Sequence, residues 1–170
     1  MITKKKTRSR TSSLKLKPLK RVLIALDYNP TAKKVAETGY SFAKTMDADV
    51  ILIHVVSEAV YYTALEYSPI MGYSGFTDSD LKINTGGLIK ASEQFLEKSK
   101  QHLGDENIKT LVAEGEFAEA ILKAAKDLNA DLIVMGSHSR RWLEKILVGS
   151  VTQQVLKNTT VPLIIVPTKE

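Results

Sequence analysis

Five short apolar runs, separated by longer segments with helical periodicity, constrain the fold of this chain most strongly. The runs span residues 21–27, 49–56, 108–114, 131–136 and 161–167. Those at 21–27, 49–56 and 131–136 are almost continuously apolar, which is typical of parallel strands covered by helices on both faces of a sheet. The run at 108–114 alternates more and the last run has Pro162 near its start, so we expect both at sheet edges.

The segments between the runs carry apolar residues at helical spacing. Helices are predicted over 29–46, 87–103, 116–130 and 150–158. Asn29 is the expected N-cap of the first helix, and Ser150 with Gln153 forms a capping-box pair at the start of the last. The apolar stripe predicted for the first helix consists of Ala32, Val35, Ala36, Gly39, Phe42, Ala43 and Met46. The alternation predicts an α/β fold, an open five-stranded parallel sheet with helices on both faces.

Charge and length divide the chain into a short tail and one domain. Residues 1–20 hold eight basic and no acidic residues, whereas the remaining 150 carry 16 basic and 19 acidic residues. We therefore predict a basic N-terminal extension over 1–19 and a single domain over 20–168. A solvated tail is the favoured interpretation, with nucleic-acid or membrane contact as the alternative. Residues 57–86 are predicted to be a long loop insertion that holds four of the six tyrosines.

The chemistry excluded by the composition is equally informative. Without cysteine the chain has no disulfide, no thiolate zinc site and no cysteine nucleophile. No apolar run approaches the roughly 20 residues that a membrane-spanning helix needs. No histidine is spaced with carboxylates as a metal site, and His54 is expected to be a packed residue of its strand. A cytoplasmic location is expected.

A ligand site is predicted where the strand order reverses. In open α/β sheets, ligands bind beyond the carboxyl ends of the strands at that point. With the order 3-2-1-4-5, the reversal lies between the first and fourth strands, next to Asp27 and Gly136. Gly136 and Gly149 are expected to permit backbone conformations and close approaches that side chains would block. A helix that begins at Ser150 would offer free N–H groups to a phosphate.

The segment "MGSHSRRWLEKILVGSV" has the spacing of a known nucleotide-binding motif. Gly136, Ser139 and Gly149-Ser150 resemble the universal stress protein family's G-x2-G-x9-G-(S/T) pattern, which follows the fourth strand and leads into the last helix. The resemblance extends over roughly residues 20–56 and 87–168. Ser139 departs from the pattern because it replaces the second glycine, and some family members without the glycine pattern bind no ATP.

The resemblance implies the Rossmann-like universal stress protein fold and an adenine nucleotide, ATP or else AMP or ADP, with Mg²⁺ carried by the phosphates. It places Asp27 beside the adenosine and Val55 near the base. The ribose and phosphate path would be lined by Met135, Gly136, His138 and Ser139. The phosphates would be held by Gly149, Ser150, Val151 and Thr152, through N–H groups and hydroxyls. The family also dimerises, which implies a homodimer through the last strand (161–167).

The function that follows is a nucleotide-dependent sensor or adaptor in the stress response, working with a protein partner that the sequence does not identify. We expect slow hydrolysis or none and predict no catalytic residues, because the motif is accompanied by no clear general base, arginine finger or metal–carboxylate pair. Two alternatives stay open. One is a protein-interaction module of the same fold that binds no nucleotide, and the other is a weak ATPase.

Overall fold

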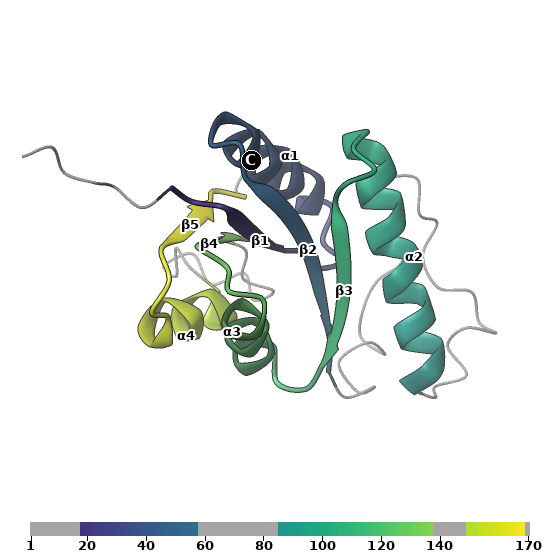
Figure 1. Cartoon of the computed structure of the whole chain (residues 1–170). Coiled ribbons are helices and arrows are strands. Elements are labelled where there is room, and N and C mark those ends of the chain that lie inside the picture. The colour runs from purple at the N-terminus through teal and green to yellow at the C-terminus, as the bar shows by residue number, and fades with distance from the viewer. Residues whose placement is uncertain (1–17, 58–84, 138–148, 169–170) are drawn as a thin grey trace, which may run out of the picture.

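The computed structural model describes residues 18–57, 85–137 and 149–168. In these ranges strands and helices alternate as β1 (Arg21–Ala25), α1 (Ala32–Thr45), β2 (Asp49–Val56), α2 (Thr85–Leu103), β3 (Lys109–Glu114), α3 (Phe117–Asp127), β4 (Leu132–Gly136), α4 (Ser150–Asn158) and β5 (Leu163–Val166). The strands form one parallel sheet in the order β3-β2-β1-β4-β5 (Figure 1). The predicted fold class, strand order and edge strands are thereby confirmed.

The two faces of the sheet have separate hydrophobic cores. Val22 and Ile24 of β1 belong to a buried cluster with residues of α1 and α2. Leu23, between them in sequence, belongs to a second cluster with residues of α3 and α4. This split follows from the period of two along a strand, which turns successive side chains to opposite faces. Helices α1 and α2 therefore cover one face and α3 and α4 the other, as Figure 1 shows.

Helix α1 begins later than predicted. Its first helical residue is Ala32 and Thr31 occupies the N-cap position, so the prediction of Asn29 as N-cap is wrong. Asn29 instead accepts hydrogen bonds at Oδ1 from Thr31 N at 3.0 Å and from Thr31 Oγ1 at 2.8 Å. An asparagine that closes a turn in this way competes with helix formation. Phe42 is 45% exposed and thus lies outside the predicted buried stripe, because it sits on the flank of the helix.

Helix α1 packs very closely on the sheet at Gly39. A Cβ at that position would lie 2.8 Å from Ile24 Cδ1 and 3.2 Å from Val134 Cγ1. Both neighbours are fully buried, so neither side chain can move into solvent. Gly39 is therefore the point at which the backbone of α1 approaches β1 and β4.

Two predicted boundaries are corrected at α4 and α2. Gly149 is the N-cap of α4, and its carbonyl accepts the first helical bond from Gln153 N at 2.9 Å. Ser150 is thus the first helical residue, and the predicted capping box is wrong. Helix α2 already includes 85 and 86, which were assigned to the predicted loop.

The rest of that loop, 58–84, and the tail up to residue 17 lie outside the described residues. No helix in the described ranges is long and apolar enough to cross a membrane.

Candidate functional site

The carboxyl ends of β1, β2 and β4 lie at the same end of the sheet because the three strands are parallel neighbours. The pairing Ala25↔Ile53 sets the register of β1 against β2, and Ile24↔Val134 sets it against β4. The chain runs from β1 to β2 and β3 on one side and to β4 and β5 on the other. The strand order therefore reverses between β1 and β4. We refer to residues 26–29, 136–137 and 149–152 together as the β1/β4 edge.

Asp27 stands at this edge, two residues beyond β1. The registers continue to bring it level with Val55 of β2 and with Ser137 after β4. Its Oδ1 accepts a hydrogen bond from Asn29 N at 3.1 Å, which fixes the carboxylate over the turn into α1. The half-buried side chain is thus held at the place where the strand order reverses.

Val55 and Met135 adjoin the β1/β4 edge, but their side chains belong to the core. Each is 5% exposed and lies in the hydrophobic cluster on the α3/α4 face. A ligand at the β1/β4 edge would therefore meet mainly the backbone of these two residues. Gly136, which ends β4, is only partly buried.

The N-terminus of α4 provides the donors of the edge. Its N-cap residue, Gly149, has no side chain that could cap it, and the first helical bond among the described residues comes from Gln153 N. The N–H groups of Ser150, Val151 and Thr152 therefore point out of the first turn without a partner inside the helix. Together with the positive end of the helix dipole, such groups favour an anion.

Ser137 fastens this helix end to the sheet. Its carbonyl accepts from Gly149 N at 3.2 Å, and its own N–H donates to Val166 O at 2.9 Å. Its Oγ accepts from Thr168 N at 3.1 Å. Thr152 adds a further tie, because its buried Oγ1 donates to Gly136 O at 3.0 Å. The start of α4, the end of β4 and the end of β5 thus form one hydrogen-bonded unit.

The glycines of the motif adopt ordinary conformations. Gly149 has φ −65° and ψ 155°, a backbone shape open to any residue. Positive φ in the described ranges occurs at Asp47, Gly104, Gly115 and Asn129, and thus not at Gly136 or Gly149. The expectation that these two glycines supply unusual backbone conformations is therefore wrong. The close approaches that these two glycines were expected to permit stay a prediction.

His138 and Ser139 lie outside the described residues, which end at 137 and resume at 149. The expected places of His138 and Ser139 on the ribose and phosphate path therefore stay predictions. His54 is described. It is 3% exposed, and its Nδ1 lies 2.8 Å from Leu26 O, so it is the packed histidine that the sequence predicted.

The groups with shifted pKa values among the described residues lie at the opposite end of the sheet, near the amino ends of the strands. A hydrogen bond from Lys44 Nζ, at 2.8 Å, holds the pKa of Asp105 well below its ordinary value, with further donation from Asn107 N and the Tyr40 hydroxyl. Burial and the neighbouring Asp105 raise the pKa of Tyr40. Asp105 precedes β3, so this network ties α1 to the α2–β3 connection. In the described ranges, no group of three or more His, Asp or Glu residues could hold a metal ion.

The family profile described as "Universal stress protein family" matches residues 18–167. Universal stress protein MJ0577 of Methanocaldococcus jannaschii is 30% identical over 155 residues, which cover 88% of this chain and 96% of that protein. A solved structure of MJ0577 aligns with a TM-score of 0.67 at 29% identity, covering 90% of this chain and 99% of the other.

Two further solved structures share the fold at lower identity. One is a universal stress protein in complex with cAMP, with a TM-score of 0.60 and 16% identity, covering 90% of this chain and all of that one. The other is the universal stress protein from Archaeoglobus fulgidus in complex with dAMP, with a TM-score of 0.54 and 16% identity, covering 88% and 98%. At this identity the likeness establishes the fold.

Proposed function

Because this chain belongs to the universal stress protein family, we propose that it binds an adenine nucleotide, ATP in the first place, at the β1/β4 edge and acts as a nucleotide-dependent sensor or adaptor in the stress response. The observation that carries the proposal is the N-terminus of α4, which starts at a glycine without a capping side chain and is fastened beside the carboxyl ends of β1 and β4. Nucleotide complexes of two structural neighbours, with cAMP and with dAMP, support the adenine class of ligand.

The hydrogen-bond donors at the β1/β4 edge are proposed to bind the phosphates of the nucleotide. The N–H groups of Ser150, Val151 and Thr152 bind phosphate oxygens, and the absence of a Cβ at Gly149 leaves room for them. The Thr152 hydroxyl already donates to Gly136 O, so Thr152 contributes its N–H alone. Ser150 is exposed, and its hydroxyl can add a donor. His138 and Ser139 would complete the phosphate side, and a divalent ion would arrive with the phosphates.

The adenosine side of the proposed site is formed by Asp27 and Val55, with Met135 and Gly136 between it and the phosphates. Asp27 can accept hydrogen bonds from ribose hydroxyls, since a carboxylate offers several acceptor positions. Among the described residues, one hydrogen bond, from Asn29 N, uses its Oδ1. The side chains of Val55 and Met135 are buried in the core, so these two residues contribute mainly their backbone to the proposed site.

Equilibrium binding of labelled ATP tests the proposal. Gly149→Val adds bulk beside the phosphate donors in a backbone conformation that valine also adopts, so we expect affinity to fall by more than tenfold. Gln154→Val is the matched control, because it places the same side chain on an exposed position of α4. ATP at 100 times its dissociation constant should also stabilise the wild type by about 2.7 kcal/mol. Absence of saturable binding at millimolar ATP would eliminate the proposal.

The melting temperature and a phosphate-release assay separate the two alternative functions from the proposed one. An interaction module that binds no nucleotide predicts an unchanged melting temperature at every ATP concentration. A weak ATPase predicts phosphate release above background that falls on mutation of Asp27 or His138, whereas the proposed sensor turns over slowly or not at all.

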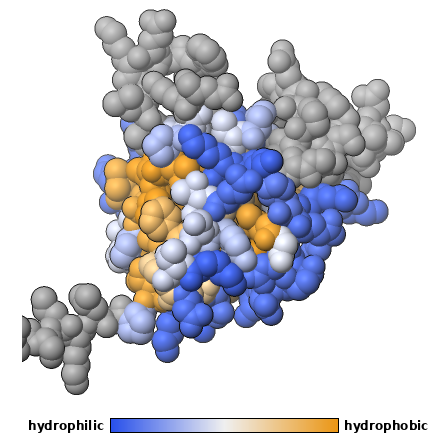
Figure 2. Space-filling model, turned by 90° about the horizontal axis from the view of Figure 1, so that it is seen from above, coloured by the Kyte–Doolittle hydropathy of each residue, from blue (hydrophilic) through white to orange (hydrophobic). Residues whose placement is uncertain are grey.

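A homodimer through 161–167 is part of the proposal. Edge strand β5 leaves Leu163, Ile164 and Ile165 only partly buried, and an exposed apolar edge favours pairing with another chain. Hydrophobic residues gather along the left of Figure 2, the side on which β5 lies in Figure 1. Ile165→Lys should shift a dimer to monomer in sedimentation velocity, and a wild type that sediments as a monomer would refute the assembly.

A further inference from the structure

We infer that Tyr28 is a positioning residue that couples the adenosine side of the site to helix α2. Tyr28 follows Asp27 directly and occupies the turn between β1 and α1. The hydrogen bond from Asn29 N to Asp27 Oδ1 closes around it. Any rotation of the Tyr28 backbone therefore also moves the Asp27 carboxylate. This inference rests on the proposed nucleotide site.

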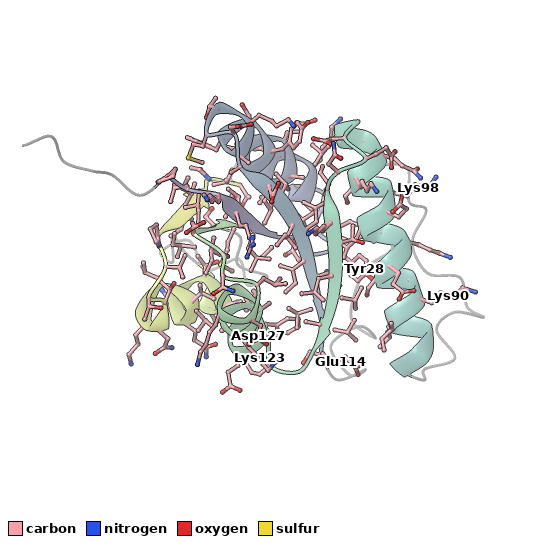
Figure 3. The ribbon with its side chains drawn as sticks, viewed as in Figure 1. Tyr28, Lys90, Lys98, Glu114, Lys123 and Asp127 are labelled. Carbon is pink, nitrogen blue, oxygen red and sulfur yellow. The ribbon has the colours of Figure 1, made fainter. Side chains whose placement is uncertain are left out.

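The ring of Tyr28 is fixed between the sheet and α2 (Figure 3). Its centroid lies 4.3 Å from that of His54 on β2 and 4.9 Å from that of Phe95 on α2. Both neighbours are buried, and each of their rings is tilted by 54° against the ring of Tyr28. Tyr28 also packs against the small cluster of Val56 and Leu88. The side chain therefore bridges from the β1/β4 edge to the first half of α2.

The hydroxyl of Tyr28 ends in a directed hydrogen-bond relay. It lies 2.9 Å from Ser92 Oγ, and Ser92 Oγ lies 2.8 Å from Leu88 O. A serine hydroxyl has one proton, and a carbonyl can only accept. The proton of Ser92 therefore goes to Leu88 O, and Tyr28 donates to Ser92. The relay joins the Asp27 turn to a carbonyl in the first turn of α2.

The consequence is that the nucleoside and α2 respond to each other. A carboxylate already held in its binding position loses less conformational freedom when the ligand arrives. Removing the Tyr28 hydroxyl frees the turn, and the net worth of one hydrogen bond corresponds to about fivefold in affinity. The loss should fall on ligands that contain adenosine, because the phosphate donors belong to α4, on the opposite face of the sheet from α2.

The chain offers a matched control for this experiment. Ser99 lies on the same helix, is fully buried and donates to Phe95 O at 2.9 Å. It therefore makes the same bond to the fourth residue before it as Ser92 makes to Leu88, but it is bonded to no tyrosine of the described ranges. Both Ser92→Ala and Ser99→Ala remove a serine-to-carbonyl hydrogen bond and should lower stability, but only Ser92→Ala should weaken nucleoside binding.

The test compares Tyr28→Phe, Ser92→Ala, the double variant and Ser99→Ala by calorimetric titration with adenosine, ATP and inorganic tripolyphosphate. We expect Tyr28→Phe to weaken adenosine and ATP binding about fivefold and to leave tripolyphosphate binding unchanged. The double variant should lose no more than the single ones, since all break the same link. Hydrogen exchange of amides 88–96 should slow on ATP addition in the wild type and respond less in Tyr28→Phe.

The possible failures are distinguishable. If the wild type binds neither adenosine nor ATP, the proposed function fails and the inference fails with it. If the wild type binds ATP but Tyr28→Phe binds it equally and keeps the exchange response, the coupling is refuted while the nucleotide site stands. If Ser99→Ala weakens adenosine and ATP binding as much as Ser92→Ala does, the effect on affinity comes from a general loss of stability. That result would also refute the inference.

Discussion

The contact between Gly39 and Ile24 predicts a stability effect whose sign depends on a single methyl group. Gly39→Ala places a Cβ 2.8 Å from Ile24 Cδ1, 3.0 Å from Ile24 Cγ1 and 3.2 Å from Val134 Cγ1. Overpacking a buried site costs about 1–3 kcal/mol. Alanine recovers about 1 kcal/mol because it is the better helix former. We therefore expect Gly39→Ala to destabilise the fold by up to about 2 kcal/mol, instead of stabilising it as in an open helix.

Ile24→Val supplies the second arm of the test because it removes Cδ1, the atom nearest to the new Cβ. Alone it should cost about 1 kcal/mol, the usual loss for one buried methyl group. Combined with Gly39→Ala, it gives the added Cβ the space that Cδ1 occupied. The double variant should therefore be more stable than the sum of the single effects by about 1 kcal/mol.

Urea unfolding followed by circular dichroism measures all three variants, with equal slopes expected because the buried area hardly changes. Ser41→Ala is the control, since it improves helix propensity at an exposed position of α1. Strict additivity of the double variant, or a full gain of 1 kcal/mol in Gly39→Ala, would refute the packing argument.

Three further predictions concern the rest of the fold. Gly115 has φ 122° and Gly104 φ 67°, both with open space around them, so Gly115→Ala should cost about 1–3 kcal/mol and Gly104→Ala about 1, by thermal unfolding. Ser137→Ala leaves the buried Thr168 N–H without its acceptor, and we expect a loss of about 1–3 kcal/mol; an unchanged melting temperature would contradict this role. The pKa of Asp105 lies below its ordinary 3.8, so Asp105 stabilises the fold above about pH 4 and this contribution fades as the pH falls further. Asp105→Asn should therefore be less stable than the wild type at neutral pH, and the difference should shrink below pH 4 in acid unfolding.

The sheet could be predicted from the sequence because each strand is a short, bounded apolar run. Helix starts could not, because they depend on which polar group captures a backbone N–H. Asn29 reads as an N-cap but forms a turn with Thr31, and Ser150 reads as an N-cap but follows Gly149 into the helix. The link from Tyr28 to Ser92 joins residues 64 positions apart and leaves no periodic signal.

The strand order alone predicts that Asp27 and the segment leading into α4 lie at the same end of the sheet, since parallel strands end together. The roles of individual groups required coordinates. Thr152 reads as a phosphate donor, but its hydroxyl is occupied by Gly136 O. Gly149 reads as a conformational necessity, but its backbone is ordinary. Thr168 gives no sign in the sequence that its N–H meets Ser137.

The hydrogen bond from Gly149 N to Ser137 O joins the two residues that flank 138–148. Ser137 and Gly149 are bonded to each other, and Ser137 is also bonded to Val166 and Thr168 at the end of β5. Sequences of other lengths could therefore be grafted between the same two anchor points while the sheet and α4 keep their positions. New ligand specificity could be introduced there without redesigning the scaffold.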